Sequence, residues 1–195
     1  MRPLPEDPKI LFSPCDCKVS VYPIREDTSF VVKDTEYTIE SLLRNRKIAA
    51  HFQGGYAVIL RLTVDDYHRY CYVDDGFKSE NYFIPGVYHT VNPIANDYAP
   101  IYKENAREFS MMKTKHFGDM IQMEVGALMV GRIVNHHGYG PMKRGMEKGY
   151  FEFGGSTIVL LLQKDKVEIR KELLERTEQL CETKIRQGEV LGRSV

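Results

Sequence analysis

The chain has 195 residues, of which 43% are hydrophobic and 28% charged, and its 27 lysines and arginines balance its 27 aspartates and glutamates. This length fits one domain with a sizeable core, and a net charge of zero without a dominant basic run argues against nucleic-acid binding. No apolar stretch reaches the roughly twenty residues that span a bilayer, and four cysteines without a signal-peptide pattern favour a reducing, cytoplasmic compartment.

Short runs of β-branched and aromatic residues recur along the chain, with turn residues between them. They lie at 18–22, 30–32, 56–62, 86–91, 120–134, 149–153 and 158–162. This rhythm predicts an antiparallel barrel or sandwich, and not alternating βαβ units. A short helix should begin near Thr38, whose side chain can cap it. We therefore expect a mainly β member of the α+β class, folded as a single domain over residues 1–195.

The C-terminal tail has a helical period from Val167 to about Ile185. Its apolar residues share one face, with charges of both signs opposite: Val167, Leu173, Leu174, Leu180, Cys181 and Ile185. The pattern predicts an amphipathic helix that packs on the β domain or on a partner. The mixed charges make docking on a membrane surface the weaker alternative. Local basic groups that could meet anionic lipid, or simply form a solvated face, are Lys113, Lys115, Lys143, Arg144 and Lys148.

The segment from Gly154 to Thr157, Gly-Gly-Ser-Thr, separates two strand-like runs. On its own it predicts a hairpin turn. Two glycines without Cβ atoms also leave the peptide bond before Ser156 open to attack, and Ser156 supplies a hydroxyl. The alternative is therefore a place where the chain cuts itself.

Other motifs in the same chain favour the chemical alternative. They are Ser13-Pro14-Cys15-Asp16, Asp66-Tyr67-His68-Arg69, Thr90-Val91-Asn92-Pro93-Ile94-Ala95, Met123-Glu124-Val125-Gly126-Ala127, and the run from Lys148 to Thr157. In this order they resemble the phosphatidylserine decarboxylase family, and the Phe-Gly-Gly-Ser-Thr form is most similar to its clostridial, type II members. Relatives usually carry a further N-terminal region before the first motif, so we expect either a short form or a truncated sequence.

The resemblance implies self-cleavage between Gly155 and Ser156, giving a β chain of residues 1–155 and an α chain of residues 156–195. Ser156 would become a pyruvoyl group, the electron sink for decarboxylation of phosphatidylserine to phosphatidylethanolamine. Asp16, His68 and Ser156 would form the Asp-His-Ser relay, with His68 as base. Two positions depart from the family pattern. Cys71 replaces a common second histidine, which leaves His68 or His89 as the base, and Cys17 replaces a common glycine.

Two alternatives stay open from the sequence. One is a pyruvoyl enzyme for another seryl lipid or a soluble amino acid derivative. The other is an unprocessed, non-catalytic β-domain binding protein. The expected partners are a phospholipid substrate and the membrane surface, contacted peripherally, and a homodimer is compatible with the sequence. We expect no metal, because Cys15 and Cys17 alone do not supply the four ligands of a zinc site.

Overall fold

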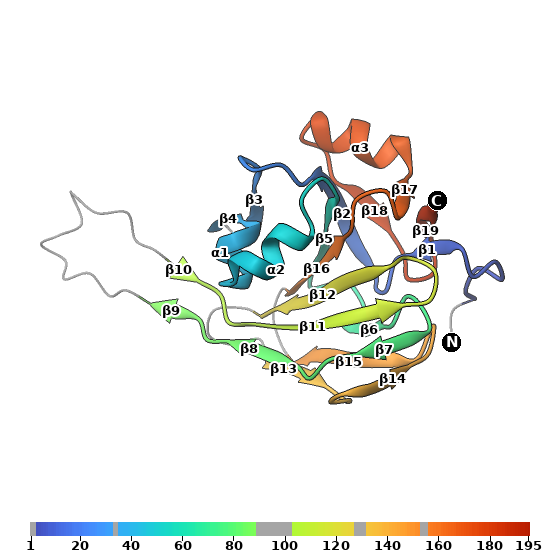
Figure 1. The fold of residues 1–195 in the computed structure, drawn as a ribbon, viewed down its shortest axis with the longest axis horizontal. Helices are drawn as coiled ribbons and strands as arrows, with labels where there is room; N and C mark the ends of the chain where they lie inside the picture. The colour runs from blue at the N-terminus through green and yellow to red at the C-terminus, as the bar shows by residue number, and fades with distance from the viewer. Residues whose placement is uncertain (1–2, 33–34, 89–102, 127–131, 153–155) are drawn as a thin grey trace, which may run out of the picture.

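The computed structural model describes residues 3–32, 35–88, 103–126, 132–152 and 156–195. Within these ranges the protein consists mostly of antiparallel strands, with three short helices (Figure 1). The predicted mainly β fold is therefore confirmed.

The largest sheet holds nine strands. They are β2 (Cys17–Pro23), β5 (Tyr56–Leu62), β7 (Gly76–Lys78), β8 (Tyr82–Ile84), β11 (Arg107–Thr114), β12 (Asp119–Val125), β14 (Gly140–Met142), β16 (Ser156–Leu162) and β18 (Thr183–Ile185). Their spatial order is β14-β7-β11-β12-β16-β5-β2-β18, and β8 also pairs with β11. Over the described residues this sheet keeps two edges, so it is sandwich-like and not a closed barrel.

Smaller sheets surround the large one. The first contains β13 (Arg132–Asn135), β15 (Glu147–Glu152) and β6 (Arg69–Cys71), and the second β1 (Ile10–Phe12), β19 (Val190–Ser194) and β17 (Val167–Ile169). Two pairs complete the set, β3 (Ser29–Val32) with β4 (Thr35–Thr38), and β9 (Val87–Tyr88) with β10 (Lys103–Glu104). Figure 1 shows β13 and β15 below β11 and β12, with the chain termini on one side of the molecule.

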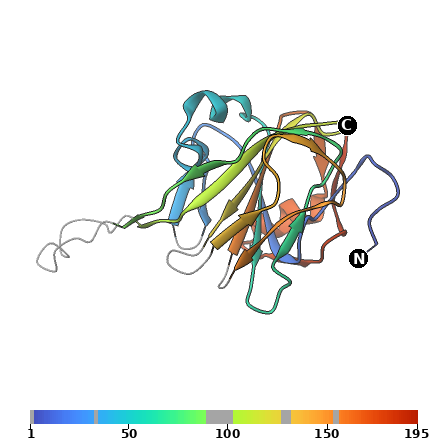
Figure 2. The same ribbon diagram turned by 90° about the horizontal axis from the view of Figure 1, so that it is seen from below.

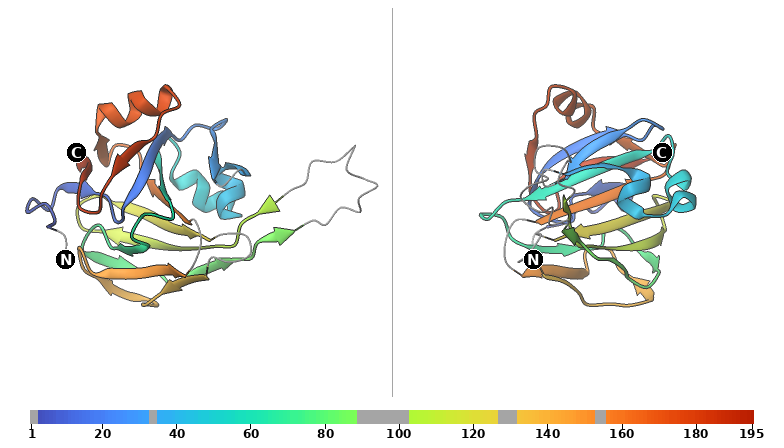
Figure 3. Two further views of the ribbon diagram at one scale, coloured as in Figure 1. Left: turned by 180° about the vertical axis from the view of Figure 1, so that it is seen from behind. Right: turned by 90° about the vertical axis from the view of Figure 1, so that its left-hand side faces the viewer.

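The central strands β5 and β16 are buried on both faces, which explains their nearly continuous apolar sequence. Ile158 and Leu160 point into a core shared with β6, β15 and the terminal strands. Val159 and Leu161 point into a second core, shared with α1 (Ile39–Leu43), α2 (Arg46–His51) and the β3–β4 pair. Figures 2 and 3 show α1 and α2, in cyan, at one side of the strands.

Thr38 caps α1 as predicted. Its hydroxyl accepts a hydrogen bond from Ser41 N at 3.1 Å, and Ser41 Oγ accepts one from Thr38 N at 3.0 Å. Two reciprocal bonds satisfy backbone donors that the first turn of a helix leaves unpaired.

The C-terminal helix, α3, is confirmed but shorter than predicted, and covers only Lys171–Glu178. The predicted outer residues Val167 and Ile185 lie in strands β17 and β18. Leu180, which we expected on the packed face, is 92% exposed. The helix therefore packs through a single turn, with Leu173 and Thr177 buried. Thr177 Oγ1 accepts a hydrogen bond from Val21 N on strand β2.

Candidate active site

Ser156 is the first residue of β16 and is almost fully buried, with 1% of its surface exposed. It lies directly opposite Leu62 of β5, and β16 pairs with β12 along its other edge. The serine is thus held in the interior of the large sheet. Gly154 and Gly155 lie outside the described residues.

His68 reaches Ser156 from the connection between β5 and β6. Its Nδ1 atom lies 3.4 Å from Ser156 Oγ, and its Nε2 atom lies 2.9 Å from the carbonyl oxygen of Thr63. Because a carbonyl only accepts hydrogen bonds, Nε2 carries the proton in this arrangement. The lone pair of Nδ1 then faces the serine hydroxyl. The two side chains that the sequence predicted as base and nucleophile are therefore brought together.

The connection that carries His68 is held by its own polar groups. Asp66 Oδ2 accepts hydrogen bonds from Thr63 N at 2.7 Å and from Thr63 Oγ1 at 2.9 Å. The His68 carbonyl accepts a hydrogen bond from Phe151 N, on β15, at 3.0 Å. Asp66 thus orders the turn that presents Thr63 to the imidazole, a role that sequence spacing alone did not indicate.

Asp16 and Cys71 both contact Gln187. Its Oδ1 atom accepts a hydrogen bond from Gln187 N at 2.8 Å, and the Gln187 side chain lies 3.3 Å from Cys71 Sγ. The predicted contact of Asp16 with His68 is not among the hydrogen bonds described for either side chain, so its place in a relay stays a prediction. Burial raises the pKa of Cys71 to about 11, with Gln187 acting in the opposite direction. At neutral pH this thiol is protonated and cannot act as a base.

The other predicted site residues contribute less. His89 lies outside the described residues. Cys15 and Cys17 are buried, and Cys17 Sγ lies 3.6 Å from Ser13 Oγ. Across the described ranges no group of three or more His, Cys, Asp or Glu side chains could hold a metal ion.

An open hollow of about 760 Å³ lies alongside β6. Its lining residues are Tyr67, Arg69, Tyr70, Cys71, Gly145, Met146, Glu147 and Gln187. Arg69 Nη1 and His136 Nε2 both contact Glu147 Oε1, at 2.6 and 2.7 Å. The Arg69–Glu147 ion pair thus forms part of the wall of this hollow, next to the residue that precedes β6, His68.

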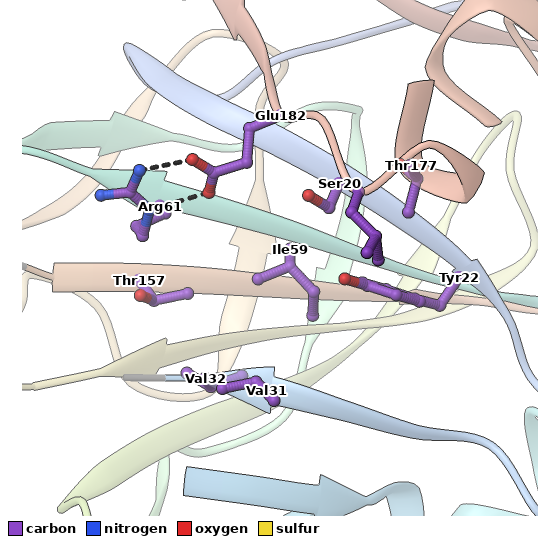
Figure 4. A pocket seen from close by; sticks show the side chains of 10 residues that line it. Ser20, Tyr22, Val31, Val32, Ile59, Arg61, Thr157, Thr177 and Glu182 are labelled. Atoms are coloured by element: carbon purple, nitrogen blue, oxygen red, sulfur yellow. Dashed lines mark hydrogen bonds and ion pairs between the residues drawn. The ribbon is translucent and has the colours of Figure 1, made fainter. Parts of the chain in front are cut away.

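The opposite face of β16 carries different groups. Thr157 lines a cavity of about 160 Å³ together with Ser20, Tyr22 and the Arg61–Glu182 ion pair (Figure 4). Thr157 lies opposite Arg61 in the sheet register. Successive side chains of a strand point to opposite faces, so Ser156 faces His68 and Thr157 faces this ion pair.

A buried ion pair close to Ser156 was missed by the sequence analysis. Lys148 Nζ lies 2.7 Å from Glu124 Oε2, and both side chains are fully buried. The expectation that Lys148 belongs to a solvated face is therefore wrong. The available signal was Glu124 near the end of an apolar, strand-like run, with Lys148 just before another.

None of the helices that the structure describes is long and apolar enough to cross a membrane.

Comparison with known proteins gives a consistent result over almost the whole chain. Residues 1–193 match the family model described as phosphatidylserine decarboxylase. Phosphatidylserine decarboxylase proenzyme 2 of Clostridium acetobutylicum is 46% identical over 184 residues, which is 94% of this chain and 63% of that protein. Proenzymes of Clostridium botulinum and Clostridium novyi are 42% and 40% identical, covering 100% and 98% of this chain and 67% and 66% of theirs. The chain thus spans about two thirds of the length of the curated relatives it matches.

Proposed function

The chain belongs to the phosphatidylserine decarboxylase family, and we propose that it cuts itself before Ser156 and decarboxylates phosphatidylserine to phosphatidylethanolamine. The observation that carries the proposal is the approach of His68 Nδ1 to Ser156 Oγ at 3.4 Å. The Thr63 carbonyl, which holds the proton on Nε2, supports it.

Self-cleavage would begin when His68 takes the hydroxyl proton of Ser156. The oxygen then bonds to the carbonyl carbon of Gly155, the peptide C–N bond breaks, and the nitrogen of residue 156 takes up a proton. Loss of the α-proton of residue 156 expels the Gly155 carboxylate and leaves dehydroalanine. Water converts this residue to a pyruvoyl group with release of ammonia. A base is required at the first step because a serine hydroxyl is almost entirely protonated at neutral pH.

The surroundings of Ser156 suit this conversion. Its buried position beside an imidazole excludes bulk water from the hydroxyl before it reacts. A pyruvoyl group at position 156 supplies a carbonyl that binds the amine of the substrate and withdraws electrons as CO₂ leaves. His68, released as a neutral base after cleavage, would stay beside that position to hold or move a proton. Asp16 remains the predicted carboxylate partner of the relay.

The two pieces would remain one folded body after cleavage. Strand β16, in the 156–195 piece, lies between β12 and β5, which both belong to the 1–155 piece. All seven residues of β16 are buried. The product should therefore be a non-covalent complex, which acts on its phospholipid at the cytoplasmic surface of the membrane through peripheral contact.

Release of CO₂ from carboxyl-labelled substrates tests the function. The purified protein should decarboxylate phosphatidylserine in vesicles, and Ser156→Ala, which cannot form the ketone, should not. Hydroxylamine should block the reaction by capturing that ketone. Release of CO₂ from a soluble seryl compound but not from the vesicles would favour the alternative substrate class. A lack of turnover together with an uncut chain would favour the non-catalytic alternative.

A further inference from the structure

A set of buried and half-buried polar side chains joins the large sheet to the β13–β15–β6 sheet. We call it the interior ion cluster. Its members are Tyr70, Glu108, Glu124, Asn135 and Lys148. Lys148 Nζ donates to Glu124 Oε2 at 2.7 Å and to Asn135 Oδ1 at 2.8 Å. Asn135 Nδ2 donates to Glu108 Oε1 at 2.7 Å and to Glu124 Oε2 at 3.1 Å, and Tyr70 Oη donates to Asn135 Oδ1 at 3.3 Å.

The cluster connects the segments that bring the candidate active site together. Glu124 lies on β12 opposite Ile158, two residues after Ser156 on the neighbouring strand. Two positions along a strand return a side chain to the same face, so Glu124 and Ser156 face the same interior. Lys148 lies on β15, whose last residue, Glu152, is the last described residue before Ser156. The same strand bonds to the His68 carbonyl through Phe151 N.

Tyr70 adds a second connection to the base. It lies in β6, two residues after His68. Its ring packs against that of Phe151, with the centroids 5.1 Å apart, and its hydroxyl donates a hydrogen bond to Asn135. The small sheet thus contains β6, which directly follows His68, and β15, which precedes the cut, whereas the large sheet contains Ser156. The interior ion cluster links the two sheets through side-chain hydrogen bonds.

Its energetic cost indicates that the cluster does more than fill space. Both partners of the ion pair are fully buried, and Glu124 Oε1 has no hydrogen-bond partner in the part of the chain that the structure describes. Burial raises the pKa of Glu124, opposed by the charge of Lys148 and the hydrogen bonds from Lys148 and Asn135. Well-packed apolar residues often replace a buried ion pair without loss of stability, while directed hydrogen bonds fix one geometry. Such a pair therefore fixes the relative position of its two strands more than it raises the free energy of unfolding.

We propose that the Glu124–Lys148 pair is a positioning device for self-cleavage, which holds β15 against β12 and thereby sets the approach of His68 to Ser156. This inference rests on the proposed function, since it concerns the rate of the cut. Among the described residues, neither side chain is hydrogen-bonded to Ser156 or His68. Both act through the strands that carry the base and the cut site.

The decisive variant replaces both partners at once, as Glu124→Met with Lys148→Met, which leaves no unpaired buried charge. Cleavage is followed by intact mass after rapid denaturation at timed intervals, and the free energy of unfolding is measured by denaturant titration in the uncleavable Ser156→Ala background. We expect the free energy of unfolding to stay close to that of the parent, while cleavage slows by about tenfold to a hundredfold through loss of alignment. Glu124→Gln, which keeps the side-chain shape, should slow the cut in the same direction.

A matched control uses the Arg61–Glu182 pair, which lies beside Thr157 on the sheet face opposite to that of Ser156 and is partly exposed (Figure 4). Arg61→Met with Glu182→Met should be cut at the wild-type rate. Wild-type cleavage in the Glu124/Lys148 double variant, or in Glu124→Gln if the double variant does not fold, would overturn the proposal. Equal slowing in the control pair would overturn it too. An uncut wild-type protein would instead refute the proposed function, so the two failures are distinguishable.

Discussion

Ser156, the first residue of β16, meets His68 of the β5–β6 connection, with 3.4 Å between the serine Oγ and the imidazole Nδ1. The Thr63 carbonyl fixes the other ring nitrogen as the protonated one. This relationship explains how a serine in a buried strand could become a nucleophile. It also assigns separate tasks to the neighbouring residues, which can be tested one at a time.

His68→Ala should accumulate uncut chain. Loss of a general base typically slows a reaction by about a hundredfold to ten-thousandfold, so cleavage should be followed over days by intact mass. Asp16→Ala should also accumulate uncut chain if the carboxylate supports the imidazole. His136→Ala, whose ring contacts Glu147 at 2.7 Å, serves as the control histidine. Equal cleavage in His68→Ala and His136→Ala would contradict the assignment of the base.

Cys71→Ala should still be cut. The pKa of this thiol is raised to about 11 by burial, so at pH 7 it stays protonated and offers no base. The measurement is the timed appearance of the 156–195 fragment in gels or mass spectra. Failure of Cys71→Ala, combined with normal cutting in His68→Ala, would make the thiol the essential participant instead.

Gly149→Ala should destabilise the fold and slow the cut. A Cβ at this position would lie 2.1 Å from the Val134 carbonyl oxygen and 2.8 Å from Tyr70 Oη. The β13–β15 pairing would have to shift, which typically costs about 1–3 kcal/mol of the free energy of unfolding. Gly138→Ala is the matched control, because its Cβ would meet only the carboxylate end of Glu80. Denaturant titration in the Ser156→Ala background compares the free energies of unfolding, and timed intact mass with Ser156 present compares the cutting rates. Equal values for the two glycine variants would contradict the prediction.

Much of the fold follows from local sequence. Thr38 was recognised as a cap because its hydroxyl and the next helical residues obey a short-range rule. The runs at 56–62 and 158–162 predict strands through their β-branched and apolar residues, and they form β5 and β16, which are buried on both faces. The C-terminal helix was overextended because Val167 and Ile185 fit a helical period, although tertiary pairing places them in β17 and β18.

Local sequence rules predict less of the candidate active site than of the fold. The pairing of His68 with Ser156 joins residues that are distant in sequence, so only the family resemblance predicted it. No local sequence pattern predicts the contact between the Thr63 carbonyl and the His68 imidazole. Glu124 and Lys148 meet only through the stacking of two sheets, a relationship that strand periodicity does not contain.

Association with membranes should be weak and reversible. We expect the protein to float with vesicles that contain phosphatidylserine and to be released by dilution, because a peripheral contact buries little apolar surface. Flotation in sucrose gradients at low and high salt measures this. Salt-resistant integration into the bilayer would contradict the peripheral assignment.

The most direct test of the account is the intact mass of the purified protein under denaturing conditions. The account predicts two pieces, residues 1–155 and residues 156–195, with the smaller piece lacking a free α-amine and carrying the mass of a pyruvoyl group in place of Ser156. Ser156→Ala should give one uncut chain. A single full-length chain in the wild type, or a cut that persists in Ser156→Ala, would contradict it.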